Sequence, residues 1–186
     1  FLNEPYERLV QSLKALPGLG YRSAEKIALH LLVEKPAKSE ELTDRISVAR
    51  QQLGPCLICG NLTDEDECNI CSSEVREVER LCIVENVTDL FAMEKAGVFR
   101  GKYHILMGKL SPVRGVGPEQ LNINSLQQRL ENSDVEEVIL ALSNDMEGEA
   151  TCHFIKNEVL KDSNLEVTRI GFGLPSGGGI TYADEN

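Results

Sequence analysis

Two pairs of cysteines constrain this chain more than any other feature of its sequence. Each pair has the spacing CxxC, Cys56 with Cys59 and Cys68 with Cys71, and eight residues separate the pairs. Each pair can place two thiolates on one metal ion, and the spacer is long enough to bring four sulfurs into a tetrahedron. The spacer is polar and cannot build a core of its own, so this knuckle needs a metal to fold. We therefore predict one zinc ion per chain, bound by these four cysteines.

The alternative is a set of free or disulfide-bonded cysteines. In a chain of intracellular character, paired CxxC units are usually metal ligands. Four thiolates leave no open coordination position for water, so the zinc is expected to be structural. The function must then be sought in the segments on either side of the knuckle.

Charge is distributed unevenly along the chain. The formal net charge of −11 argues against a nucleic-acid partner, because binding DNA requires cations that neutralise phosphates. Residues 1–38, however, carry a balance of +2, which leaves −13 for the remainder. No apolar run is long enough to span a bilayer, and the N-terminus lacks the layout of a secretory signal. We expect a cytoplasmic protein with no membrane contact.

The first 54 residues predict a helical module. Apolar residues recur at helical spacing in three segments, which end before Pro17, Pro36 and Gly54. Ser23 is a candidate cap for the second helix. The three apolar stripes are Tyr6, Leu9, Val10 and Leu13; Ile27, Ala28, Leu31 and Leu32; and Leu42, Ile46, Ala49 and Leu53.

The turn between the first two helices carries a candidate DNA contact. Gly18 and Gly20 permit positive φ and a close approach of the backbone to another molecule. Backbone N–H groups here can bind a phosphate, and Arg22 and Lys26 lie four residues apart beside them. The stretch resembles the helix-hairpin-helix motif, which grips DNA backbones without reading sequence. The plainer alternative is an ordinary helical hairpin closed by a Pro-Gly turn.

The pattern changes from helical to alternating after Cys71. Short apolar runs at 81–84, 103–106, 138–142 and 165–170 are separated by helical segments near 88–96, 124–132 and 147–162. Strands that alternate with helices predict a mostly parallel sheet covered on both faces. Ligands of such sheets bind at the carboxyl ends of the strands.

Acidic residues follow two of these strands. Glu85 comes after the first strand, and Asp145, Glu147 and Glu149 come after the third, so we expect an acidic cluster. The arrangement resembles a Toprim domain, the module of topoisomerases, primases and some nucleases. Ser143 stands where its catalytic members have an Asp, and a hydroxyl is a poor ligand for Mg²⁺. The plainer alternative is a set of solvated carboxylates favoured by a helix dipole.

The three modules in this order resemble the RecR family of bacterial recombination mediator proteins. Residues 108–118 resemble its glycine-bearing Toprim loop, residues 147–151 its acidic run, and residues 173–186 its Walker-B-like C-terminal segment. Arg22 and Lys26 depart from the family, which more often has Lys and Arg at these places; the charge is kept but not the bidentate geometry.

The resemblance implies a protein without catalytic activity that acts in DNA repair and homologous recombination. It implies a ring-shaped homo-oligomer, expected to be a tetramer, which binds single- and double-stranded DNA and works with RecO and RecF to load recombinase. It places the protein in the bacterial cytoplasm, associated with the nucleoid. Any Mg²⁺ at Glu85, Asp145, Glu147 or Glu149 is expected to be weakly bound, and these residues are also candidate partner contacts.

The predicted fold class is α+β with several modules. The boundaries are 1–54 for the helix-hairpin-helix module, 55–78 for the zinc finger, 79–172 for the Toprim domain and 173–186 for a C-terminal segment expected to be truncated. One rival function is a Mg²⁺-dependent Toprim nuclease or topoisomerase-like enzyme, with Glu85, Asp145 and Glu147 as metal ligands. Another is a purely protein-binding adaptor.

Overall fold

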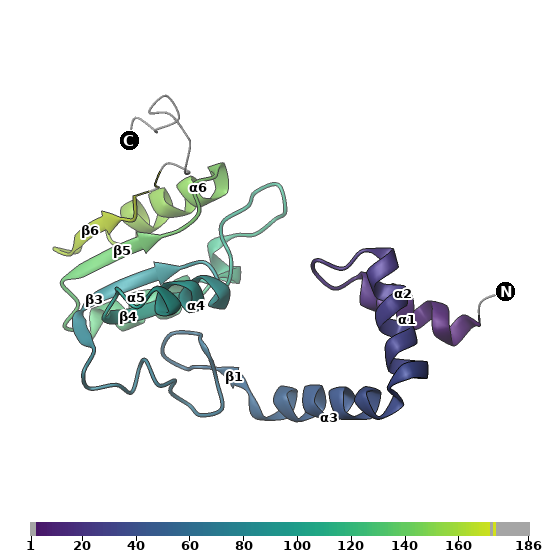
Figure 1. The fold of residues 1–186 in the computed structure, drawn as a ribbon. Helices are drawn as coiled ribbons and strands as arrows, with labels where there is room; N and C mark the ends of the chain where they lie inside the picture. Colours follow the sequence, from purple (N-terminus) through teal and green to yellow (C-terminus); the bar gives the residue numbers. More distant parts are fainter. Residues whose placement is uncertain (1–2, 172, 174–186) are drawn as a thin grey trace. The chain divides into compact units, whose positions relative to one another are not determined.

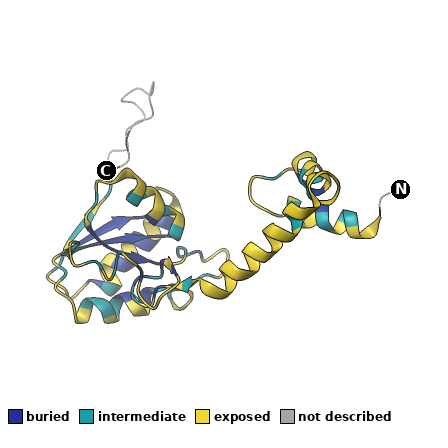
Figure 2. Ribbon diagram, turned by 60° about the horizontal axis from the view of Figure 1, so that its bottom comes forward, coloured by how far each residue is buried: buried dark blue, intermediate teal, exposed yellow. Residues whose placement is uncertain are grey.

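The chain forms two compact units, residues 1–53 and 54–186 (Figure 1). The computed structural model describes residues 3–171 and 173, so the Walker-B-like segment lies outside the described residues except for Gly173. Each unit has its own buried residues (Figure 2). Within the described part of the chain, no helix has the length and apolar content needed to cross a membrane.

Helices α1 (Glu4–Lys14) and α2 (Tyr21–Leu29) pack together in the first unit. Its core consists of Val10 from α1 with Ala24 and Ala28 from α2. The methyl side chains of the two alanines leave room for the larger residues of α1. The remaining members of the predicted α1 stripe, which pack against this core, are Tyr6, Leu9 and Leu13.

The second helix differs from the prediction at both ends. It begins at Tyr21, and the extended Gly20 precedes it, with its carbonyl accepting the Ala24 N–H at 3.0 Å. Ser23 is therefore already inside the helix, so its predicted capping role is wrong. Beyond Leu29 the chain continues in a π-helical turn, η1 (His30–Glu34). Leu32, a member of the predicted apolar stripe, lies in this turn and is 48% exposed.

Helix α3 (Pro36–Gln52) begins directly after this turn. Proline is well suited to the first helical position, because an N–H at this position has no partner within the helix. The predicted apolar stripe of α3 does not form a core, because α3 has no buried residue and Ile46 is 58% exposed. Figure 2 shows this helix exposed along its length.

The second unit contains a four-stranded parallel sheet in the order β4-β3-β5-β6. The strands are β3 (Glu77–Val84), β4 (Gly101–Ile105), β5 (Glu137–Ala141) and β6 (Glu166–Arg169). The connecting helices are α4 (Val87–Ala96), the short η2 (Pro118–Gln120), α5 (Ile123–Glu131), and α6 (Met146–Phe154), which continues as the π-helical η3 (Ile155–Val159).

Both faces of the sheet are covered, as the continuous apolar strands predict. In β3, Leu81 and Ile83 belong to the core formed with α5 and α6, whereas Cys82 and Val84 belong to the core formed with α4. Strand β3 begins four residues earlier than its apolar run, at Glu77, which pairs with Gly101 of β4. The α+β architecture predicted from the sequence is confirmed.

The cysteine knuckle belongs to the second unit. It begins with a minimal antiparallel ladder between β1 (Gly54–Pro55) and β2 (Leu62–Thr63). The division between the two compact units falls at Leu53 and Gly54. The exact limits of the three smaller domains stay predictions.

Candidate functional site

The four cysteine sulfurs form one cluster. All four Sγ atoms lie within 4.8 Å of one another, and the Sγ atoms of Cys59 and Cys68 are 3.6 Å apart. A tetrahedral zinc ion with Zn–S bonds of about 2.3 Å separates its sulfurs by about 3.8 Å. Cys56, Cys59 and Cys68 are buried and Cys71 is half-buried. The cluster therefore fits a closed zinc site.

Backbone hydrogen bonds preorganise the sulfurs as ligands. The N–H of Asn61 donates to Cys59 Sγ at 3.4 Å, and the N–H of Cys68 donates to Cys56 Sγ at 3.3 Å. A hydrogen bond with Cys71 lowers the pKa of Cys59 to about 5, whereas burial raises the pKa of Cys68. A divalent cation would stabilise all four as thiolates and cross-link the two CxxC pairs.

The knuckle is attached to the edge strand β4. Lys102 is only 7% exposed, and its Nζ donates to three knuckle carbonyls, Ile70 at 2.9 Å, Cys71 at 2.9 Å and Ser73 at 2.7 Å. The N–H of Ile105 donates to the carbonyl of Cys59 at 2.8 Å. The knuckle thus covers an edge of the sheet that would otherwise expose unpaired backbone groups.

The acidic residues meet where the strand order reverses. Strands β3 and β5 are neighbours in parallel register, so Glu85 and the residues after β5 emerge at the same edge. The Ser143 N–H donates to Glu85 Oε1 at 2.6 Å. Asp145 caps α6 by accepting the Gly148 N–H at 2.7 Å. A Cβ at Gly148 would lie 2.0 Å from the Ser143 carbonyl oxygen, so this close approach requires glycine.

Two cations from the loop after β4 reach these carboxylates. Lys109 Nζ donates to Ser143 Oγ at 2.8 Å, pairs with Asp145 and lies 3.9 Å from Glu85 Oε2. Its hydrogen bond is the main reason that the pKa of Asp145 falls to about 2. Arg114 Nη2 pairs with Glu147 Oε2 at 2.6 Å.

Glu149 forms an ion pair with the last strand. Its side chain pairs with Arg169 of β6, at 2.8 Å between Oε2 and Nη1. Three of the four predicted acidic residues therefore converge around the loop cations. The grouping of Glu149 with them stays a prediction.

The predicted DNA contact lies on the surface of the first unit. Gly18 has φ +79°, whereas Gly20 is extended. The first three N–H groups of α2 precede its first helical hydrogen bond and are available to a ligand. Arg22 and Lys26 are exposed, and within the described part of the chain neither forms an ion pair. The turn thus presents backbone donors and two cations on one helix.

Comparison with known proteins accounts for nearly the whole chain. Residues 6–50 match the RecR helix-hairpin-helix family model, residues 53–73 match the RecR four-cysteine zinc finger domain, and residues 79–171 match the Toprim domain. A "Recombination protein RecR" from Moorella thermoacetica is 44% identical over 182 residues, which cover 98% of this chain and 91% of that protein. The chain belongs to the RecR family.

A second RecR relative supports the same assignment. The "Recombination protein RecR" of Francisella tularensis subsp. mediasiatica is 41% identical over 177 residues, 95% of this chain and 88% of that protein. The resemblance inferred from the sequence motifs is therefore confirmed. The zinc-finger match and the sulfur cluster together support zinc as the metal of the knuckle.

Sequence reasoning misses the two cations of the Toprim loop in this RecR-family chain. The glycines identify the loop, but its sequence pattern gives Lys109 and Arg114 no role. One signal is available: both residues follow β4, the next strand in the chain after Glu85. This position predicts a contact with the carboxylates only when the strand order, which places the loop beside Glu85, is known.

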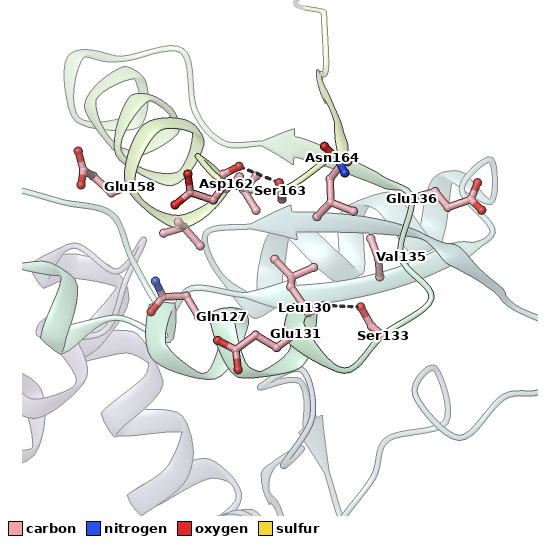
Figure 3. A pocket seen from close by; sticks show the side chains of 13 residues that line it. Gln127, Leu130, Glu131, Ser133, Val135, Glu136, Glu158, Asp162, Ser163 and Asn164 are labelled. Carbon is pink, nitrogen blue, oxygen red and sulfur yellow. Dashed lines mark hydrogen bonds between the residues drawn. The ribbon is translucent and has the colours of Figure 1, made fainter.

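The described residues also line a cavity of 690 Å³ that is separate from the acidic cluster (Figure 3). It lies between the end of α5 and the segment after η3, and residues just before β5 and β6 contribute to it. These are the amino ends of the strands, opposite the edge that carries Glu85. No predicted site residue lines this cavity.

Proposed function

We propose that this RecR-family protein binds DNA without reading its sequence and acts as a recombination mediator in DNA repair. The observation that carries the proposal is the exposed pair Arg22 and Lys26 beside the open turn at the start of α2. Cations and backbone N–H groups of this kind contact phosphates, which are the same at every base pair. The positive balance of residues 1–38 acts in the same direction.

The protein acts as an oligomeric ring, a tetramer in our proposal. Support comes from apolar side chains on the first unit, where Leu32, Val33 and Ile46 are 48%, 70% and 58% exposed. Apolar surface of this kind marks contacts with other chains. In a ring, several first units with a positive balance face the DNA together, so the local potential outweighs the negative net charge.

RecO and RecF are the proposed partners, and loading recombinase onto single-stranded DNA is the proposed task. The RecR-family match supports this assignment. Light scattering of the native protein, with and without DNA, tests for four chains. Co-elution with purified RecO tests the partnership, and a mixture that elutes as two separate proteins would contradict it.

We also propose that the protein has no catalytic activity. Support comes from the Toprim centre, where Ser143 offers a neutral hydroxyl and Lys109 places an ammonium group among the carboxylates. Mg²⁺ requires several hard, charged oxygens in near-octahedral geometry. The rival enzyme function predicts Mg²⁺-dependent DNA nicking or relaxation that is abolished in Asp145→Asn. Detection of that activity would replace our proposal.

The double variant Arg22→Ala with Lys26→Ala tests the DNA site. Each lost phosphate contact flattens the slope of log affinity against log salt by about one unit. We expect a flatter slope and an affinity lower by roughly tenfold or more, since hydrogen bonds to charged groups contribute about 1.5–3 kcal/mol each. Fluorescence anisotropy with DNA of two unrelated sequences measures both quantities.

The matched control is Lys14→Ala with Lys35→Ala, which removes the same charge from exposed positions of the same unit. Zinc content and oligomeric mass should be unchanged in both double variants. If the Arg22 and Lys26 variant binds DNA no more weakly than the control, the turn is only a connection between two helices.

A further inference from the structure

The ammonium group of Lys109 lies among the oxygen atoms of the Toprim centre. Its Nζ donates to Ser143 Oγ at 2.8 Å, pairs with Asp145 and lies 3.9 Å from Glu85 Oε2. The side chains of Lys109 and Glu85 are only 17% and 11% exposed. Lys109 is therefore an enclosed cation with three oxygen neighbours, unlike a freely moving surface lysine.

The backbone holds Lys109 in this position from both sides. Before it, Met107 has φ +63°, a left-handed conformation that non-glycine residues seldom adopt, and Gly108 has φ +135°. The Gly108 N–H donates to the Glu85 carbonyl at 2.9 Å, and the Leu110 N–H donates to Thr151 Oγ1 at 2.9 Å. Its two neighbours are thus tied to the end of β3 and to α6.

A second cation completes the charge balance of the same loop. Arg114 pairs with Glu147, and the fully buried Ser111 donates its hydroxyl hydrogen to the same carboxylate. Glu85, Asp145 and Glu147 therefore face two cations supplied by the chain. A divalent metal would have to displace Lys109 to obtain these oxygens, because two cations at one position repel each other strongly.

We propose that Lys109 is the built-in counter-ion of the Toprim carboxylates, occupies the position that a divalent metal would need, and thereby excludes Mg²⁺ from this site. The inference deepens the proposed lack of catalysis, yet it concerns metal binding alone. DNA binding and the absence of nicking can therefore both hold even if it fails. Its consequence is that the loop is held over the strand ends by ion pairs within the chain.

Lys109→Met removes the ammonium group and keeps the apolar stem. The test measures Mn²⁺ binding by electron paramagnetic resonance, and Mg²⁺ binding by calorimetry, on the full chain with zinc bound. We expect Lys109→Met to bind one Mn²⁺ per chain roughly tenfold or more tightly than the unaltered protein, because a nearby like charge has been removed. The matched control is Lys156→Met, an exposed position that should leave metal binding unchanged.

Adding Asp145→Asn to Lys109→Met should abolish the gained site, which assigns it to these carboxylates. Lys109→Gln, which keeps a donor for Ser143, serves if the Met variant fails to fold by circular dichroism. Equal affinity with and without Lys109, no binding by either protein, or a gained site that persists in the Asp145→Asn background would each overturn the proposal.

Discussion

Lys102→Met is the most informative test of how the zinc knuckle depends on the Toprim sheet. Lys102 is nearly buried on β4, and its ammonium group donates to the carbonyls of Ile70, Cys71 and Ser73 at 2.7–2.9 Å. Methionine keeps an unbranched stem of similar length but cannot donate. The change therefore removes three hydrogen bonds at little cost in packing.

The size of the effect follows from these contacts. A hydrogen bond to a charged group contributes about 1.5–3 kcal/mol, and a buried carbonyl left without its donor costs about 1–3 kcal/mol. The three bonds share one ammonium group, whose own burial is unfavourable, so their contributions do not simply add. We expect the free energy of unfolding to fall by about 4 kcal/mol, a large part of the roughly 5–15 kcal/mol available to a domain.

Zinc retention provides the readout that is specific to the site. One of the three acceptors is the carbonyl of Cys71, whose sulfur is a predicted zinc ligand. Loss of Lys102 should therefore make the backbone of Cys71 more mobile and speed zinc release to a chromogenic chelator. Denaturant unfolding of the same samples measures the stability change. Lys95→Met, on the exposed side of α4, is the control and should match the unaltered protein in both assays. Wild-type zinc release and a stability change within about 0.5 kcal/mol for Lys102→Met would refute the reasoning.

Three further outcomes are expected. Gly148→Ala should lower the free energy of unfolding by about 3 kcal/mol, because the new Cβ would meet the Ser143 carbonyl oxygen at 2.0 Å; denaturant unfolding, with Gly54→Ala as control in open space, checks this. Cys59→Ala should reduce zinc from one ion per chain to none by metal analysis; full zinc content in this variant would contradict the four-sulfur site. Burial lowers the pKa of His104 to about 4, so below about pH 6.5 the unfolded chain takes up the proton first, and stability should fall by up to about 3 kcal/mol as the pH drops to 4. The free energy of unfolding, measured between pH 5 and 7, should decrease with falling pH, and His104→Gln should make this dependence weaker. An identical pH dependence in the variant would refute the assignment to His104.

Short-range patterns predicted most of the architecture. The CxxC spacing predicted that Cys56, Cys59, Cys68 and Cys71 form one cluster, because each pair spans a single tight turn. The alternation of apolar runs with helical segments predicted the parallel sheet. These predictions succeeded because both patterns depend on the local backbone geometry of the chain. The spacing of residue types along the sequence reflects that geometry directly.

Element ends were predicted less well, for a local reason that the sequence leaves open. Both Gly20 and Ser23 can precede a helix, and hydroxyl residues are the commoner caps. Helix α2 begins at Tyr21, because the Ala24 N–H donates to the carbonyl of the extended Gly20 at 3.0 Å and Ser23 therefore lies inside the first turn. The identity of the candidate caps does not show which residue makes this first hydrogen bond.

The sequence by itself determined which residues could carry charge and bind metal, and which segments would become helices or strands. Only the tertiary structure decided which charges meet. Lys109 reaches Asp145 across 36 residues of chain because β4 and β5 flank β3 in the sheet, and Lys102 reaches Ser73 across 29 because the knuckle covers the β4 edge. Contacts over such separations depend on strand order and register, which are set by burial of the whole sheet. Strand order and register cannot be predicted from the pattern of any single segment of the sequence.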